Sequence, residues 1–141
     1  MEKIYDVKIN ILSVISTVGA NPGDEDRSEG TYDGKLREYD GGKLCLTYSE
    51  RTEGGEVSSE IHILDGRTVV KRRGAIVSDM VFTEGKKNTS LYTIPPHSFD
   101  MTVECRRLKV QTGDREGRVD LLYKMEIGGE SRSCRMRIVW N

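Results

Sequence analysis

The feature that most constrains this chain is a regular alternation of apolar and polar side chains, which is clearest near residue 140. In "RSCRMRIVW" every second residue is apolar: Cys134, Met136, Ile138 and Trp140. The preceding segment "GRVDLLYKMEI" repeats the alternation, and the turn-forming "GGES" lies between the two. Successive side chains of a β-strand point to opposite faces, so this period indicates strands with one buried and one wet face. Residues 118–140 are therefore predicted to form a long hairpin.

The same period recurs along most of the chain. It predicts about ten strands, with these approximate bounds: 5–18, 28–39, 43–51, 57–64, 67–73, 76–84, 88–94, 98–110, 117–128 and 131–140. No window carries the apolar stripe of an amphipathic helix together with helix caps. The fold class is therefore predicted to be all-β.

The connections between these strands are short and rich in Gly, Asp and Asn, as in "DGGK", "LDGR" and "TGDREG". Such turns join antiparallel neighbours, so we expect an up-and-down β-barrel of about eight to ten strands. The apolar parity changes after Cys105, which predicts a bulge near Arg106 and Arg107. Only residues 16–30 resemble a longer loop, expected at one rim of the barrel.

Length and composition restrict the setting of the protein. A chain of 141 residues suits a single domain, expected over 1–141. Its net charge of −1 does not indicate a general polyanion binder. No segment has the apolar length of a membrane span or the pattern of a signal peptide. Three widely spaced cysteines favour no disulfide framework, so a reducing, cytoplasmic location is expected.

Several short motifs occur together in an order that resembles a known family. They are Glu29-Gly30 followed by Tyr32, Arg72 with Gly74, Phe82 with Gly85, Tyr92 followed by Pro95, and Tyr123. Their order and spacing over nearly the whole chain resemble the YwiB-like family of bacterial proteins, a domain of unknown function found largely in Firmicutes.

The resemblance implies a calycin-like β-barrel, a shape shared with lipocalins and fatty-acid-binding proteins. It implies no activity, and a fold alone does not specify a ligand. The chain departs from the family pattern around its Pro-Pro turn, where Ile94 replaces a Thr and His97 follows instead of a Gly. It also lacks the Gly-x-Trp signature of true lipocalins, since its single tryptophan is Trp140.

Arg72 is the first candidate for a binding residue. In "TVVKRRG" the alternation places Arg72 on one face and Lys71 and Arg73 on the other. If Val70 points inward, Arg72 enters the barrel mouth or interior, where an unpaired guanidinium is costly. It is then either satisfied by an internal acid or by strand ends, or it anchors an anionic ligand.

Aromatic and methionine side chains form the second candidate group. Tyr92, Tyr123, Phe82, Met80 and Met125 are expected on inward faces. There they either fill the core or line a pocket for an apolar or amphipathic ligand, with tyrosine hydroxyls orienting it.

Catalytic and metal sites are not expected from the sequence. His62 and His97 are far apart, neither is predicted beside a cysteine, and no metal-ligand spacing or phosphate-binding loop is present. The aromatic residues share parity with the apolar faces, which disfavours a sheet that stacks on RNA bases. We therefore assign no catalytic residue, metal or cofactor.

Two functional hypotheses remain. In the first, a non-enzymatic barrel binds a small amphipathic or anionic molecule through Arg72, Tyr92, Tyr123 and Phe82. In the second, the barrel is filled and docks through an outer sheet face to a protein or RNA partner, or to a second copy of itself. A continuous internal cavity favours the first hypothesis and a packed interior favours the second.

Overall fold

The computed structural model describes residues 2–17 and 25–141, and all of its regular structure is β-strand. The strands are β1 (Lys3–Thr17), β2 (Glu25–Glu38), β3 (Leu44–Thr52), β4 (Gly55–Leu64), β5 (Arg67–Gly74), β6 (Val77–Phe82), β7 (Lys87–Ile94), β8 (His97–Gly113), β9 (Glu116–Ile127) and β10 (Glu130–Trp140). These residues include no helix long and apolar enough to cross a membrane.

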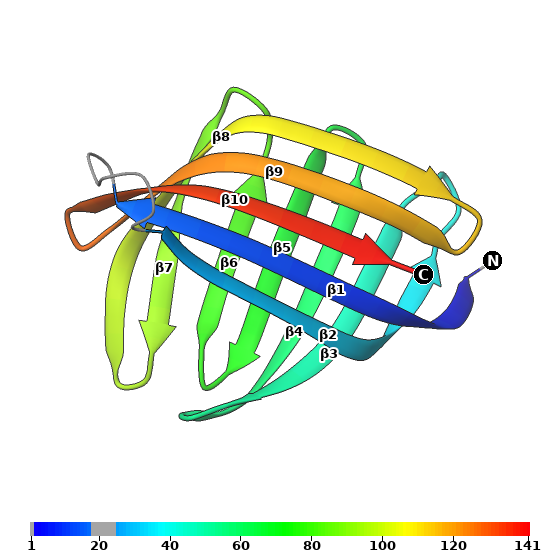
Figure 1. Cartoon of the computed structure of the whole chain (residues 1–141), viewed down its shortest axis with the longest axis horizontal. Helices are drawn as coiled ribbons and strands as arrows, with labels where there is room; N and C mark the ends of the chain where they lie inside the picture. Colours follow the sequence, from blue (N-terminus) through cyan, green and yellow to red (C-terminus); the bar gives the residue numbers. More distant parts are fainter. Residues whose placement is uncertain (1, 18–24) are drawn as a thin grey trace.

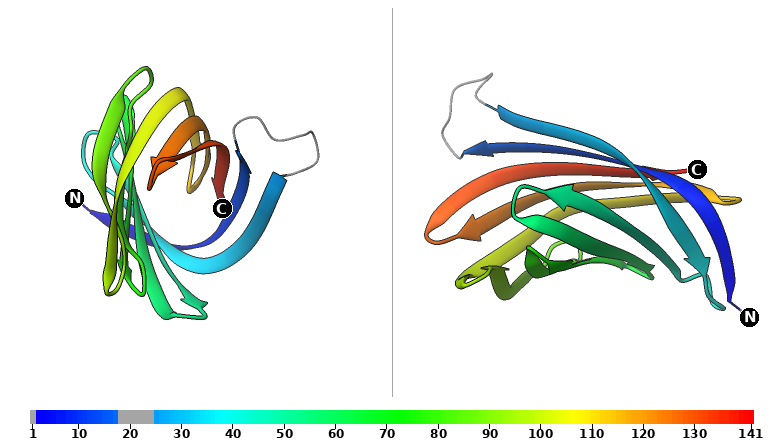
Figure 2. Two further views of the ribbon diagram at one scale, coloured as in Figure 1. Left: turned by 90° about the vertical axis from the view of Figure 1, so that its left-hand side faces the viewer. Right: turned by 90° about the horizontal axis from the view of Figure 1, so that it is seen from below.

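The ten strands close into an antiparallel barrel. Each strand pairs with its neighbours in the chain, and β1 pairs with β2 on one edge and with β10 on the other. The predicted up-and-down barrel is therefore confirmed. The long strands β8, β9, β10, β1 and β2 form one curved side, and the shorter strands β3 to β7 form the other (Figures 1 and 2).

The barrel core follows from the alternation in the sequence. Among the fully buried apolar side chains are Ile9, Leu46, Phe82, Met101 and Trp140, which come from five different strands. They belong to one continuous cluster inside the barrel. Because a one-residue slip would turn a whole strand inside out, burial of one face also fixes the register between strands.

The predicted bulge is present in β8. The register between β8 and β9 shifts between Cys105 and Arg107. Cys105 is fully buried, while Leu108, three residues later, packs partly against the same core. The extra residue restores the inward direction of the apolar side chains after the change of parity.

The loop expected over residues 16–30 is shorter than predicted. Residues 16 and 17 complete β1, and residues 25–30 begin β2 and pair with β1 from Ser16 to Ile11. Residues 18–24 lie outside the described residues. The loop prediction was wrong for 25–27, while 28–30 were also predicted to begin a strand; partner pairing in the ladder overrides weak local β-propensity at 25–27.

One seam of the barrel is much shorter than the others. Strands β6 and β7 share only two register pairs, Val77 with Thr93 and Ser78 with Tyr92. Farther along the seam, side chains of β7 bond to the backbone of β6. Asn88 Nδ2 donates to the Val81 carbonyl at 3.3 Å, and Ser90 Oγ donates to the Asp79 carbonyl at 2.8 Å. Side chains thus replace part of the backbone ladder.

A close approach between β9 and β10 requires a glycine. Gly117 is the register partner of Trp140, whose ring is fully buried. A Cβ atom built on Gly117 would lie 2.1 Å from Trp140 Cζ2. The indole therefore packs directly on the glycine backbone, at the end of the barrel where the β8–β9 turn lies.

We expect Gly117→Ala to destabilise the fold by about 1–3 kcal/mol, because the new methyl group must displace a buried indole ring. Gly54→Ala is the control, since its Cβ would meet only ordinary contacts, and it should change stability by less than about 0.5 kcal/mol. Urea unfolding followed by tryptophan fluorescence measures both. Equal stabilities of the two variants would contradict the packing described.

We expect backbone amides along the β6–β7 seam to exchange with deuterium faster than those of β8 and β9, because fewer ladder bonds protect them. Hydrogen-exchange mass spectrometry of peptides covering 77–94 and 101–127 provides the comparison. Equal protection of the two regions would show that the side-chain bonds of Asn88 and Ser90 fully replace the ladder.

Candidate functional site

A cavity of about 420 Å³ opens inside the barrel at the end where β9 turns into β10. Its apolar lining consists of Ile15, Met80, Met101, Met125, Ile127 and Met136. Its polar lining consists of Ser13, Ser28, Arg72, Tyr92, Tyr123, Glu130 and Arg132. A concave site that combines apolar side chains with polar groups that can orient a ligand is typical of small-molecule pockets of this size.

Arg72 enters this cavity from β5, whereas Arg73 points away from it. Arg73 Nη1 forms an ion pair with Asp79 Oδ1 at 3.0 Å on the outer surface. Within residues 2–17 and 25–141, Arg72 forms no ion pair, and its buried Nε has no hydrogen-bond partner. No carboxylate of the described residues therefore lies within ion-pair distance of this arginine.

Arg72 belongs to a row of inward polar side chains that crosses five strands. Register pairs connect Tyr48 with Ser59, Ser59 with Arg72, Arg72 with Ser78, and Ser78 with Tyr92. Ser78 is fully buried, and its Oγ has no hydrogen-bond partner in the described structure. Polar groups that are buried without partners cost stability. Arg72 Nε and Ser78 Oγ are such groups, and a bound polar molecule would supply their partners.

The tyrosines near Arg72 are neutral at physiological pH. Burial, followed by the hydrogen bond from Tyr32 Oη to Glu50 Oε2 at 3.1 Å, raises the pKa of Tyr32 to about 12. Burial also raises the pKa of Tyr48 and of Tyr123. The positive charge of Arg72 acts in the opposite direction on the pKa of all three hydroxyls. These side chains can therefore donate hydrogen bonds.

The net charge inside the cavity comes from Arg72. Glu130 and Arg132 also line it, but they neutralise each other through an ion pair of 3.0 Å between Oε2 and Nη2. Among the described lining residues, Arg72 is left as the uncompensated charge. A single positive group among methionines and tyrosines gives the cavity an amphipathic character.

The predicted site residues are only partly brought together. Arg72, Tyr92 and Tyr123 share the cavity, as do Met80 and Met125. Phe82 is fully buried and is not part of the lining; its ring packs edge-on against Tyr123 at 4.8 Å between centroids. Phe82 thus packs against Tyr123 from the side of the core and not from the cavity.

Sequence reasoning overlooked Ser78 and the pair Glu130–Arg132. Ser78 could have been found, because it shares inward parity with Met80 and Phe82. The Glu130–Arg132 ion pair lies at the start of β10, directly after the β9–β10 turn. The alternation of apolar and polar residues does not fix where a strand begins after a turn, so this pair was not predicted.

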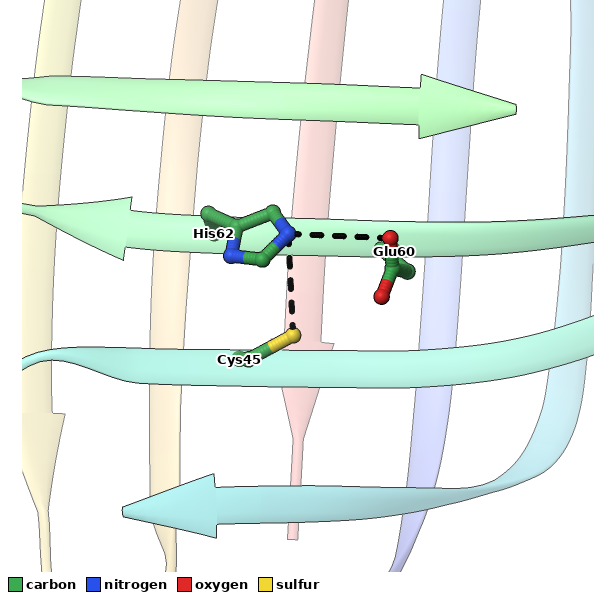
Figure 3. A group of neighbouring side chains, drawn as sticks. All are labelled: Cys45, Glu60 and His62. Carbon is green, nitrogen blue, oxygen red and sulfur yellow. Dashed lines mark hydrogen bonds and ion pairs between the residues drawn. The ribbon is translucent and has the colours of Figure 1, made fainter. Parts of the chain in front are cut away.

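A second group of reactive side chains lies on the outer face of the β3–β4 hairpin. Cys45 Sγ is 3.9 Å from His62 Nε2, and Glu60 Oε2 is 3.8 Å from the same nitrogen (Figure 3). The expectation that neither histidine lies beside a cysteine was therefore wrong. A two-residue turn at Glu53 and Gly54 puts Cys45 directly opposite His62, and only this register reveals the group.

This group is not arranged as a nucleophilic triad. In such a triad the nucleophile and the carboxylate contact opposite nitrogens of the imidazole, whereas here both face Nε2. Burial, followed by the charge of Glu60, raises the pKa of Cys45 to about 11. An activated cysteine instead has a lowered pKa. Instead, the three donor atoms of this group face a common point.

The fold and the family are shown by comparison with known proteins. A solved structure described as the crystal structure of ywiB protein from Bacillus subtilis matches with a TM-score of 0.85 at 20% identity, covering 98% of this chain and 92% of that one.

In sequence, the chain is 23% identical over 130 residues to the "Uncharacterized beta-barrel protein YwiB" of Bacillus subtilis (strain 168), covering 92% of this chain and 88% of that protein. Residues 9–138 match the model of a domain of unknown function, DUF1934. The resemblance inferred from the motifs is thereby confirmed, and the chain belongs to the DUF1934 family.

Proposed function

We propose that the barrel binds a small amphipathic anion in its interior cavity. The observation that carries the proposal is Arg72, whose guanidinium faces a cavity of about 420 Å³ without a carboxylate partner among the described residues. An anionic group placed there would form charge-assisted hydrogen bonds with it. The cavity supports this function over that of a filled barrel acting as an interaction module.

The other lining residues suit the remaining parts of such a ligand. Tyr92 and Tyr123 offer hydroxyls in the same cavity as Arg72, and Ser78 Oγ offers a further polar atom in the same row. The four lining methionines provide a flexible apolar surface that adapts to an alkyl or aromatic group. The ligand would thus lie with its charge on the β5 side and its apolar part among the methionines.

The edge of the barrel beside Tyr92 is also apolar. Ile94 and Phe99 share its inward parity, and they remain 46% and 44% exposed at the end of the β7–β8 hairpin. An amphipathic molecule that approaches the cavity would meet these side chains first. This function requires no catalytic residue and no cofactor.

The three cysteines are compatible with the cytoplasmic location that we propose. Cys45, Cys105 and Cys134 are free and buried, on β3, β8 and β10. Free buried thiols are typical of proteins that stay in a reducing compartment.

We expect Arg72→Met to weaken binding of the amphipathic anion 1-anilinonaphthalene-8-sulfonate by at least about tenfold, because one charge-assisted hydrogen-bonded contact is lost. The matched control is Arg73→Met, which removes the neighbouring outward arginine and should leave the affinity unchanged. Fluorescence titration gives the dissociation constants, and competition with decanoate tests whether an unrelated amphipathic anion occupies the same site.

Two results would contradict the proposed function. One is equal affinity of Arg72→Met and the unmodified protein, and the other is an equal loss in both arginine variants. Far-ultraviolet circular dichroism of the variants separates loss of binding from loss of the fold.

A further inference from the structure

The group on the outer face of the β3–β4 hairpin has the composition of a metal site. Its donor atoms are a thiol, an imidazole nitrogen and a carboxylate oxygen, and all three lie within 4.8 Å of one another. We propose that Cys45 Sγ, His62 Nε2 and Glu60 Oε2 bind one Zn²⁺ ion. The site is separate from the interior cavity, and the inference does not depend on the function proposed for that cavity.

The convergence of these donors is a property of the strands and not of mobile loops. Cys45 and His62 are direct register partners on β3 and β4, and Glu60 lies two residues before His62 on the same face. Residues i and i+2 of a strand project in the same direction. Adjacent strands hold partner residues about 5 Å apart, so the backbone itself sets the spacing of the three ligands.

Two of the three distances between donors are close to those around a zinc ion. With Zn–S near 2.3 Å, Zn–N and Zn–O near 2.0 Å and tetrahedral angles, two ligand atoms lie roughly 3.3–3.6 Å apart. The corresponding distances here are 3.9 Å from Cys45 Sγ to His62 Nε2 and 3.8 Å from His62 Nε2 to Glu60 Oε2. Side-chain rotations would have to shorten these two distances by a few tenths of an ångström and also draw together Cys45 Sγ and Glu60 Oε2, which lie within 4.8 Å of each other, without movement of the strands.

Burial and charge also suit a bound cation. Cys45 is 2% exposed, while the side chains of His62 and Glu60 are 29% and 53% exposed. An ion held between them would rest on the barrel wall and take its fourth ligand from solvent water. A thiolate and a carboxylate together neutralise the charge of Zn²⁺.

Two cations lie near this group. Arg37 and Lys71 both act on the Cys45 thiol electrostatically. Arg37 is the register partner of Cys45 on β2, and its Nη1 forms an ion pair with Glu2 Oε1 at 3.0 Å. Lys71 is the register partner of Glu60 on β5, which places it on the far side of the carboxylate from Cys45.

Binding would proceed without any change of oxidation state. The S–H bond of Cys45 breaks as the Sγ–Zn bond forms, and the proton passes to solvent. His62 binds as the neutral imidazole through Nε2, with its proton on Nδ1. Glu60 binds as the carboxylate.

The test is titration of the full chain with Co²⁺, which replaces Zn²⁺ and absorbs light when a thiolate binds it. We expect one equivalent of Co²⁺ to produce a thiolate charge-transfer band that Zn²⁺ abolishes. Cys45→Ser should lose the band. His62→Ala and Glu60→Gln should each weaken Co²⁺ binding by at least about 100-fold, which is the upper end of the loss caused by removing an outer partner of a metal ligand.

The chain offers matched controls. His97→Ala removes an exposed histidine at the start of β8, and Glu56→Gln removes an exposed glutamate on the same face of β4 as Glu60. Cys134→Ser removes a buried thiol that faces the barrel interior. All three controls should retain the band and the affinity, and Zn²⁺ should raise the melting temperature of the unmodified protein but not that of His62→Ala.

The proposal is overturned if the unmodified protein gives no charge-transfer band, or if the band persists in Cys45→Ser. It is also overturned if His62→Ala and His97→Ala bind Co²⁺ equally well. Because His62 and Glu60 are partly exposed, their variants should keep the fold even if Cys45→Ser does not, and circular dichroism verifies this.

Discussion

The closed backbone ladder is the constraint on which the rest of this structure depends. Once β1 pairs with both β2 and β10, the chain has an inside and an outside, and each residue belongs to one of them by its parity. Side chains that alternate along a strand then become two separate chemical surfaces. The interior holds the core and a cavity, and the exterior holds ion pairs and the Cys45 group.

Much of this arrangement is readable from the sequence. The period of two predicted ten strands, the bulge near Arg106, and the inward direction of Arg72, because each depends only on local alternation. The start of β2 at residues 25–27 was not predictable, since it depends on pairing with β1. The cavity was not predictable either, because packing density is a property of the closed barrel and not of one strand. The meeting of Cys45 with His62 depends on the register of one hairpin, which the turn at Glu53 and Gly54 encodes.

Arg72 is a polar side chain that the barrel holds in its interior without an ion-pair partner among the described residues. A guanidinium in an apolar interior costs stability unless it is paired, and here the described chain supplies tyrosine hydroxyls and serines but no carboxylate within ion-pair distance. The neighbouring Arg73, with its opposite parity, is paired with Asp79 on the surface. Two adjacent arginines therefore have different roles, although they have the same chemistry and the same strand.

The short seam between β6 and β7 marks the part of the barrel wall that the fewest backbone bonds hold together. A closed ladder has a fixed circumference, so any expansion must occur where the fewest backbone bonds resist it. The two register pairs of this seam include Ser78 with Tyr92, both in the polar row around Arg72. The seam with the fewest backbone bonds therefore coincides with the polar part of the cavity, so that any widening of the barrel there would separate members of the Arg72 row.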